Sequence, residues 1–399
     1  MQNETLLSII IATKNRQKYL LKAVESILEV SDNSFELVVQ DNSDEDTLKL
    51  ELSKYKHDKR LVYRYTNESF SFIDNFNASI ELSTGRYLCL IGDDDGINPE
   101  LFEVVKWMKL NNIDALSGNL AANYRWAKTG APNTFFTKMT DSTLTITHFD
   151  GKLYKVNIED SLQKLMKNGA TNYLEFMLPK LYHGVIKRSF FEKVKGITGQ
   201  YINGLSPDIY SSVSLACLID NLVYIDYPIT IPGVCAESGS IREGQKKDHS
   251  KKLADAPHFK NRPNYVWSKE VPEIFCVQTI WADSCIAAIR DMGREDLMNY
   301  FDKYMLYANI IEADKSLKSL IYEQYIKTDT DKAFLNKAYR KGPLIKFIKN
   351  RALGRLRKIL KLERFDDFLE LDTIVEATHK LTEYLRNHDF SIKNILKKW

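Results

Sequence analysis

The chain has 399 residues, of which 44% are hydrophobic and 27% charged, so it can bury sizeable cores and is not a disordered or fibrous protein. Its 56 Lys and Arg against 53 Asp and Glu leave a net charge of +3, which argues against general nucleic-acid binding. The five cysteines form no C-x-x-C pair, which excludes the usual spacing of a structural zinc site. Without an apolar run near the roughly 20 residues of a membrane span, we expect a cytoplasmic location, with peripheral attachment to the inner face of the cytoplasmic membrane as an option.

Strand and helix patterns alternate over the first hundred residues. Apolar periodicity predicts buried strands at 6–12, 35–40, 61–65 and 86–91, and helices at 17–29 and 73–83. Strands joined by helices of this length indicate a largely parallel sheet with right-handed crossovers.

Polar residues follow three of these strands, at 13–16, 41–44 and 93–95. In a parallel sheet, ligands bind beyond the carboxyl ends of the strands. We therefore expect these three groups to converge on one edge of the fold.

The remaining chain divides into a weakly patterned middle and a helical end. Short elements are expected near 142–149, 182–195, 209–219 and 222–225, and the polar run 233–252 is predicted to be a loop. After about residue 268 the pattern is helical. We accordingly expect an α/β domain over 1–260 and a helical domain over 261–399.

Three carboxylates, Asp93, Asp94 and Asp95, come directly after the strand at 86–91. Adjacent carboxylates repel one another, and a fold keeps them together where a cation offsets their charge. Hard divalent cations prefer oxygen ligands and bridge carboxylates to substrate phosphates. A solvated acidic turn is the alternative interpretation.

Three segments together resemble the family 2 glycosyltransferases, which have the GT-A fold. They are SIIIATKNR at 8–16, VVQDNSDED at 38–46, and a third segment that carries Asn77, Ser83, Gly85, Arg86, Tyr87, the three aspartates and Pro99. The resemblance is clear over about 5–110, thin to about 235 and absent from the C-terminal third. It implies that 1–260 is a Rossmann-like, nucleotide-sugar-binding catalytic domain.

The resemblance also implies roles for single residues. Asp41 would bind the base, which makes a UDP-sugar the first expectation for the donor, and Asp93 would face the ribose or donor sugar. Asp94 or Asp95 would coordinate Mn²⁺ or Mg²⁺. The other residues expected at the nucleotide or donor are Thr13, Asn15, Arg16, Ser43 and Asn77. Phe76 departs from the family, which often has an arginine at this place.

An inverting transferase needs a carboxylate that deprotonates the acceptor hydroxyl. Asp208, after Ser206 and Pro207, matches the position that the family uses and is the candidate base. A carboxylate that only stabilises the helix N-terminus is the alternative, and Glu175 and Asp220 are weaker candidates.

Two further segments carry expectations of their own. Ser240 and Arg242 could approach the leaving diphosphate and His249 could join the metal, unless this is a plain surface loop. The segment 332–362 holds eleven Lys or Arg and no Asp or Glu. Its apolar stripe suits either an anionic membrane surface or packing on its own domain. The C-terminal helices could also form a homo-oligomer.

The resemblance therefore implies a metal-dependent, inverting glycosyltransferase that uses a nucleoside-diphosphate sugar, and it also implies the kind of acceptor. Its acceptor would be a saccharide or a lipid-linked saccharide in bacterial surface-polysaccharide synthesis. A nucleotidyltransferase of nucleotide-sugar synthesis is a weaker alternative, because such enzymes usually have a glycine-rich loop and residues 13–16 contain no glycine. A non-catalytic scaffold that kept the fold is the third alternative.

Overall fold

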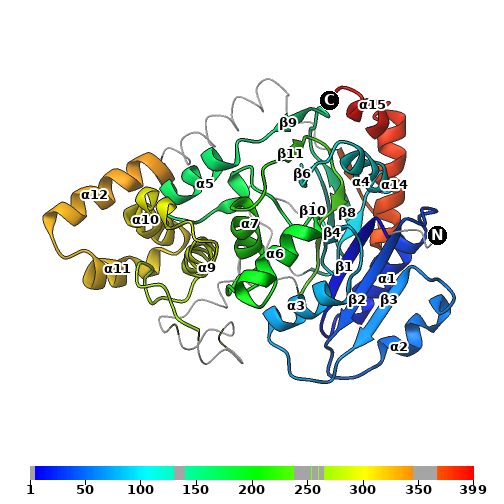
Figure 1. The fold of residues 1–399 in the computed structure, drawn as a ribbon, viewed down its shortest axis with the longest axis horizontal. Helices are drawn as coiled ribbons and strands as arrows, with labels where there is room; N and C mark the ends of the chain where they lie inside the picture. Colours follow the sequence, from blue (N-terminus) through cyan, green and yellow to red (C-terminus); the bar gives the residue numbers. More distant parts are fainter. Residues whose placement is uncertain (1–4, 130–139, 238–252, 254–258, 260–264, 345–365) are drawn as a thin grey trace.

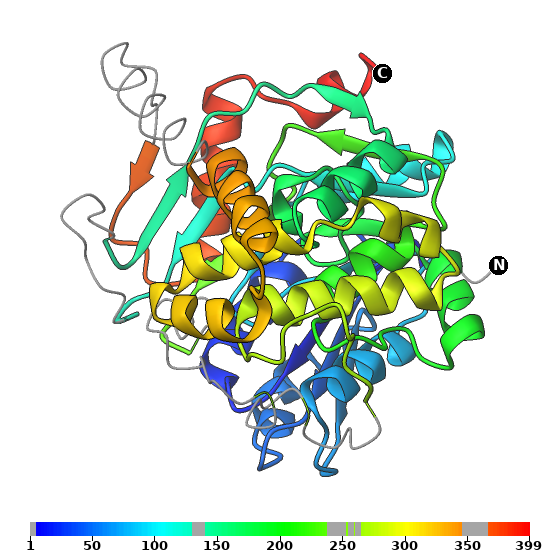
Figure 2. The ribbon, with the colours of Figure 1, turned by 90° about the vertical axis from the view of Figure 1, so that its left-hand side faces the viewer.

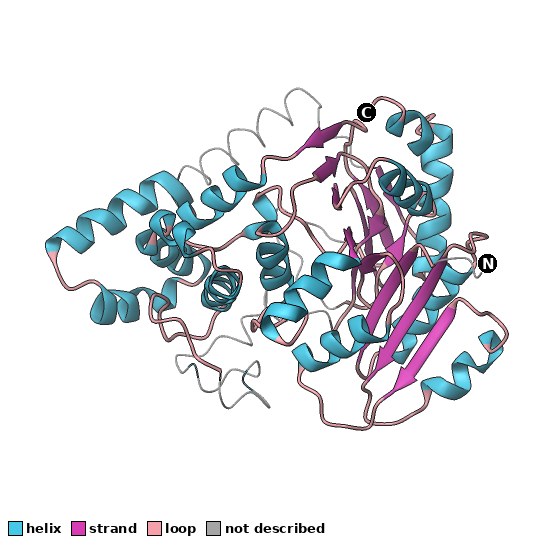
Figure 3. Ribbon diagram, in the orientation of Figure 1, coloured by secondary structure: helices cyan, strands magenta, loops and turns pink. Residues whose placement is uncertain are grey.

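A central eight-stranded sheet organises the part of the chain that the computed structural model describes, namely residues 5–129, 140–237, 253, 259, 265–344 and 366–399. The strand order is β3-β2-β1-β4-β10-β6-β11-β9. Only β10 and β9 run antiparallel to their neighbours in this sheet. Helices flank the sheet and a helical region follows it (Figure 3), which confirms the predicted fold class.

Six of the eight strands of this sheet lie close to or within the predicted ranges, and the other two, at 115–118 and 153–155, match no predicted element. In chain order the eight strands are β1 (Leu7–Thr13), β2 (Phe35–Asp41), β3 (Leu61–Tyr65), β4 (Tyr87–Leu90), β6 (Ala115–Gly118), β9 (Leu153–Lys155), β10 (Gly184–Lys187) and β11 (Leu222–Ile225). The helices that precede residue 226 are α1 (Gln17–Leu28), α2 (Leu48–Glu51), α3 (Phe72–Leu82), α4 (Leu101–Leu110), α5 (Ile158–Lys167), α6 (Arg188–Thr198) and α7 (Pro207–Ala216).

Both faces of the sheet are buried. In β1, Ile9 and Ile11 pack into one core with α1 and α4, whereas Ile10 points into the other core with α3, α6 and α7. Side chains alternate across a strand, so a strand covered on both faces has a continuous apolar sequence. This explains why the run of isoleucines in β1 predicted a buried strand.

The helical region forms two groups. The helices α9 (Val277–Asp291), α10 (Lys303–Ala313), α11 (Lys318–Tyr325) and α12 (Asp329–Tyr339) gather on one side of the molecule (Figures 1 and 2). The helices α14 (Ile374–Asn387) and α15 (Ile392–Leu396) return to the sheet domain, where α14 packs on α1 and α15 on α4. Ser26 Oγ lies 2.9 Å from Thr378 Oγ1 at this contact. The division at residue 260 stays a proposal.

A short strand also interrupts the predicted helical end. The strand β14 (Asp366–Phe368) pairs antiparallel with β8 (Thr143–Ile146). It completes a second sheet with β7 (Ala122–Arg125) and β13 (Gly233–Val234). The two-residue strands β5 (Gly96–Ile97) and β12 (Thr230–Ile231) pair with each other in a separate, antiparallel two-stranded sheet. A three-residue strand has no periodicity to detect, and its partner lies more than two hundred residues away, so the sequence pattern could not reveal it.

The basic segment 332–362 is described only as far as residue 344. In α12, Leu335 and Ala338 are buried against the helical group while Lys332 and Lys337 are exposed. This part packs on its own domain, and the remainder lies outside the described residues. Within the described ranges, no helix is both long and apolar enough to cross a bilayer.

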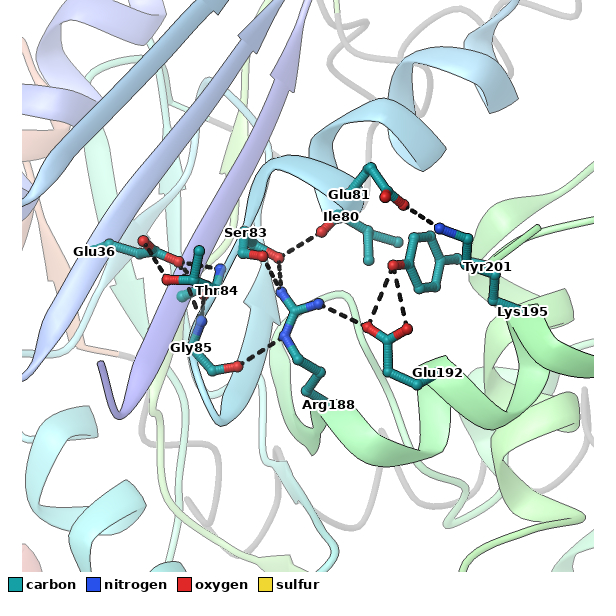
Figure 4. Close-up of polar contacts among 11 residues, drawn as sticks. Glu36, Ile80, Glu81, Ser83, Thr84, Gly85, Arg188, Glu192, Lys195 and Tyr201 are labelled. Carbon is teal, nitrogen blue, oxygen red and sulfur yellow. Dashed lines mark hydrogen bonds and ion pairs between the residues drawn. The ribbon is translucent and has the colours of Figure 1, made fainter. Parts of the chain in front are cut away.

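A buried polar network anchors the start of β4 (Figure 4). The carboxylate of Glu36 accepts hydrogen bonds from Ser8 Oγ at 2.7 Å and from the Thr84 amide at 2.5 Å. Nε of Arg188 donates to the Gly85 carbonyl at 3.0 Å. A Cβ on Gly85 would lie 2.6 Å from the Ser8 nitrogen, so only glycine allows β4 to start this close to β1. The network thereby holds the start of β4, the strand that leads into the acidic turn.

Candidate functional site

The ends of β1 and β4 meet at one point, as expected from the parallel sheet. Thr13 Oγ1 donates a hydrogen bond of 2.7 Å to Oδ2 of Asp93. The Thr13 carbonyl in turn accepts from the Asn42 amide at 3.0 Å, which brings in the end of β2. Asn75 Nδ2 on α3 donates to the same carbonyl at 3.1 Å. Three strand ends and one helix therefore build one edge.

The guanidinium of Arg16, just before α1, faces the acidic turn. Its two terminal nitrogens lie 2.9 Å from Oδ1 of Asp93 and 2.9 Å from Oδ2 of Asp94. One of them also donates to Sγ of Cys235 at 2.6 Å. Burial alone would lower the pKa of Arg16, but Asp93 and then Asp94 raise it above its ordinary value. Arg16 is thus a fixed positive charge against two of the three aspartates.

Asp95 is held differently. Its oxygens accept the main-chain amides of Gly92 at 2.5 Å and Gly233 at 2.6 Å, and Nε2 of His183 lies 3.3 Å from Oδ2. Burial, and then the charge of Asp94, raises the pKa of Asp95. These contacts tie the turn to β13. If Asp95 is a metal ligand, as predicted, the metal ion would have to share its oxygens with these hydrogen bonds or displace them.

A divalent cation suits Asp93 and Asp94 as part of its ligands. Both carboxylates are buried and adjacent. Oδ1 of Asp93 has the Arg16 guanidinium as its ion-pair partner at 2.9 Å, but within the described residues no donor reaches it with hydrogen-bond geometry. Burial, opposed by Arg16 and reinforced by Asp94, raises the pKa of Asp93, so added positive charge would favour its ionised form. Among the described residues, no group of three or more His, Cys, Asp or Glu is arranged to hold a metal. Water and a phosphate-bearing ligand could supply the remaining oxygens.

The loops after β1 and β2 are cross-linked beside this turn. Asp41 accepts the Ser43 amide at 2.9 Å through Oδ1 and the Tyr63 hydroxyl at 3.0 Å through Oδ2. The Asn15 amide donates to Ser43 Oγ at 2.9 Å, and Asn15 itself has a left-handed φ of 56°. Asn15 and Asp44 also exchange two hydrogen bonds, at 2.7 and 2.9 Å. The predicted nucleotide residues of these two loops therefore lie together.

Asp208 lies in the first turn of α7 and lines a small cavity with Phe76 and Tyr182. Burial raises its pKa to about 6. Tyr182 lines the same cavity as Asp208, and burial, followed by the charges of Asp208 and of the acidic turn, raises the pKa of its hydroxyl. A Cβ on Gly92 would lie 2.5 Å from that hydroxyl. The candidate base and the acidic turn are consequently neighbours across one tyrosine.

The contacts of the other predicted residues do not place them at the acidic turn. The amide of Asn77 pairs with the main chain of Ile202 through two hydrogen bonds of 2.9 Å, so it braces α3 against the segment before α7. Glu175 and Asp220 are exposed. Their functional roles stay predictions. Ser240, Arg242 and His249 lie outside the described residues.

Sequence reasoning missed the residues that support the acidic turn from distant strands. Trp126 Nε1, after β7, donates to the Asp94 carbonyl at 2.9 Å. Gly233 passes so close that a Cβ there would lie 1.8 Å from that carbonyl. The imidazole of His183 is held at Nδ1 by Thr230 Oγ1 at 3.0 Å, and burial, followed by the charge of Lys180, lowers its pKa to about 3. No local motif marks these residues.

Comparison with known sequences gives one family. Residues 8–166 match the family described as Glycosyl transferase family 2. The putative colanic acid biosynthesis glycosyl transferase WcaA of Escherichia coli is 30% identical over 107 residues, 26% of this chain and 38% of that protein. The GalNAc(5)-diNAcBac-PP-undecaprenol beta-1,3-glucosyltransferase of Campylobacter jejuni is 26% identical over 192 residues, 47% of this chain and 53% of that protein. An uncharacterized glycosyltransferase of Rickettsia felis is 30% identical over 113 residues, 28% of this chain and 18% of that protein. The chain thus matches from under a fifth to about half of the length of these curated relatives.

Solved structures show remote similarity. The complex of S. aureus TarS 1-349 with UDP-GlcNAc aligns with a TM-score of 0.46 and 14% identity, over 84% of this chain and 79% of that chain. Mannosyltransferase PcManGT from Pyrobaculum calidifontis, in complex with GDP-Man and Mn²⁺, aligns with a TM-score of 0.39 and 12% identity, over 85% of this chain and 87% of that chain.

Proposed function

We propose that the chain belongs to glycosyl transferase family 2, whose model matches residues 8–166, and that it transfers a sugar from a nucleoside-diphosphate donor to an acceptor hydroxyl. A UDP-sugar is the proposed donor, and a saccharide or lipid-linked saccharide of a bacterial surface polysaccharide is the proposed acceptor. The named activities of the E. coli and Campylobacter relatives support this acceptor class.

One observation carries the proposal. The ends of β1 and β4 place Asp93 and Asp94 against Arg16, with Thr13 hydrogen-bonded to Asp93. Two carboxylates and one guanidinium on the carboxyl edge of a parallel sheet can bind a diphosphate together with its counter-ion. Asp41, at the end of β2, would bind the base of the nucleotide from the neighbouring loop.

Asp93 and Asp94 would hold a divalent cation, with Mn²⁺ or Mg²⁺ as the proposed ions. When bound, such an ion stabilises the negative charge of a departing diphosphate as a Lewis acid. Arg16 can stay with the carboxylates or turn to the phosphate oxygens, and in either place it adds positive charge next to the leaving group. Trp126 and Gly233 hold the main chain of Asp94 in position.

Asp208 would act as the general base of an inverting reaction. Its carboxylate takes the proton from the acceptor hydroxyl while the oxygen of that hydroxyl bonds to the anomeric carbon, and the nucleoside diphosphate leaves from the opposite face. A base works best when its pKa lies near the working pH, and the pKa of about 6 satisfies this condition. Tyr182 and Phe76 line the small cavity beside this carboxylate.

The test is a calorimetric titration of UDP, GDP, dTDP and CMP, with and without Mn²⁺. We expect one nucleoside diphosphate, UDP, to bind more tightly with Mn²⁺, and Asp94→Asn to remove that gain. Asp329→Asn is the matched control, because its side chain is 98% exposed on α12. If no nucleotide binds under either condition, the proposed donor site is wrong and the scaffold alternative stands.

A further inference from the structure

A second cavity, of about 280 Å³, lies beside the candidate active site. Its wall is formed by the end of β6, by Tyr224 of β11 and by the segment 174–180. Leu174 and Met177 on this segment are 52% and 45% exposed. A polar strand end opposite apolar and aromatic side chains is a surface suited to a sugar ring, which has hydroxyls at its edge and C–H bonds on its faces.

Lys180 is the one positively charged side chain among the described residues that line this cavity. Burial lowers the pKa of its ammonium. Within the described residues it has no salt bridge or hydrogen bond to a carboxylate. The other charged lining residue, Glu175, is exposed. A partly buried ammonium without a salt-bridge partner is costly to fold, and an anion in the cavity would offset that cost.

The cavity is connected to the acidic turn through a short segment of chain. Leu181 and His183 pair with the end of β4, because the Leu90 amide donates to the Leu181 carbonyl at 3.0 Å and the His183 amide donates to the Leu90 carbonyl at 3.0 Å. His183 contacts Asp95, and the charge of Lys180 reaches His183. Lys180 therefore lies one short segment away from the site proposed for the donor diphosphate.

We propose that this cavity binds an anionic group, a carboxylate or a phosphate, on the acceptor saccharide, with Lys180 as its counter-ion. The assignment of the ligand as an acceptor rests on the proposed transferase function, whereas the binding of an anion at Lys180 does not. The acceptor would accordingly be an acidic or phosphorylated saccharide, with Leu174, Met177 and Tyr224 against its ring.

The test is NMR of the full chain after reductive ¹³C-methylation of its lysines, which keeps their charge. Lys180→Met identifies the Lys180 signal and is expected to fold, because it removes a buried charge. Glucuronate, glucose 6-phosphate and glucose are the probes. We expect a saturable shift of the Lys180 signal with one or both anions and none with glucose. Glucuronate alone would indicate a uronic-acid acceptor, and glucose 6-phosphate alone a phosphorylated one.

The affinity of the variants supplies the second readout. Lys180→Met should weaken binding of the active probe by about tenfold or more, because a charge-assisted contact is lost, and Lys180→Arg should restore part of it. Lys187→Met, on the neighbouring strand β10, is the matched control and should bind as the wild type does. No shift with either anion, or equal binding by Lys180→Met, overturns the proposal.

A parallel titration with UDP and Mn²⁺ separates this inference from the proposed function. If the nucleotide binds and the anions do not, only the anion site is wrong. If the anions shift Lys180 and no nucleotide binds, the anion site stands and the transferase assignment fails.

Discussion

Oδ2 of Asp95 lies 3.3 Å from Nε2 of His183, and both side chains are buried. The neighbouring carboxylate of Asp94 instead faces Arg16 at 2.9 Å. Adjacent aspartates of one turn therefore differ in their surroundings. Asp95 joins the turn to the rest of the fold, whereas Asp94 and Asp93 both face Arg16, at the site proposed for the cation and the diphosphate.

Asp94→Asn should consequently affect ligand binding, whereas Asp95→Asn should affect the stability of the fold. We expect Asp94→Asn to reduce Mn²⁺-dependent nucleotide binding by about tenfold or more with little change in Tm. Asp95→Asn should lower the free energy of unfolding by about 1–3 kcal/mol, because an amide offers one acceptor oxygen where two main-chain N–H groups need two. Thermal unfolding and calorimetry of both variants check this. A stable Asp95→Asn that has lost metal-dependent binding would instead identify Asp95 as the metal ligand.

Gly233→Ala should displace the acidic turn from a distance. A Cβ at Gly233 would lie 1.8 Å from the Asp94 carbonyl, so the backbone has to move. We expect a lower Tm and weaker Mn²⁺-dependent nucleotide binding. Gly196→Ala in α6 is the matched control, since no atom lies within 4 Å of a Cβ there. It should leave binding unchanged and raise stability by up to about 1 kcal/mol, because alanine favours a helix over glycine.

Asp208→Asn tests the general base. Loss of the base should reduce kcat by about 10²- to 10⁴-fold, while nucleotide binding persists. Since burial raises the pKa of Asp208 to about 6, the wild-type kcat should fall as the pH drops through about 6, where the carboxylate becomes protonated. Asp220→Asn, an exposed carboxylate beyond the same helix, should keep both the rate and the pH profile. Equal loss in the two variants would contradict the assignment.

The same substitution should stabilise the folded protein at neutral pH. A carboxylate whose folded pKa is raised is costly to keep ionised, and this cost is present above about pH 6 and disappears as the pH falls below the unfolded value near 4. Asp208→Asn therefore raises Tm at pH 7.5 and loses this advantage at low pH. Melting curves over that pH range measure the difference, and an unchanged or lower Tm at pH 7.5 argues against a desolvated carboxylate.

Glu36→Gln should destabilise the fold without acting on the chemistry. Its Oε1 accepts hydrogen bonds from Ser8, Thr84 and Gly85, and its Oε2 accepts one from the Thr84 hydroxyl, in a buried site. An amide lacks the negative charge that strengthens these bonds, and its NH2 group would face the Thr84 hydroxyl in place of Oε2. We expect a loss of about 1–3 kcal/mol in urea unfolding. Glu81→Gln removes an exposed ion pair with Lys195 and should cost less than about 1 kcal/mol. Similar losses in both variants would mean that the buried network contributes little.

Much of the sheet and of the nucleotide edge could be predicted from local sequence. The continuous apolar run of β1 and the apolar spacing of α1 are properties of neighbouring residues, so both elements appear in the pattern. Because the carboxyl ends of parallel strands meet at one edge, the placement of Thr13 beside Asp93 also follows from strand order. The family resemblance then supplied roles for those residues, and these roles remain to be tested.

Only the tertiary structure decided which partners the side chains of the acidic turn contact. The three aspartates are adjacent residues of the same type, so the sequence does not tell them apart. Their contacts differ because Gly233 and His183 approach Asp95 from distant elements, whereas Arg16 approaches Asp93 and Asp94. The return of α14 to α1 and the desolvated ammonium of Lys180 likewise depend on contacts between remote segments. Composition and periodicity report on a residue's neighbours along the chain, whereas hydrogen-bond partners and burial are set by neighbours in space.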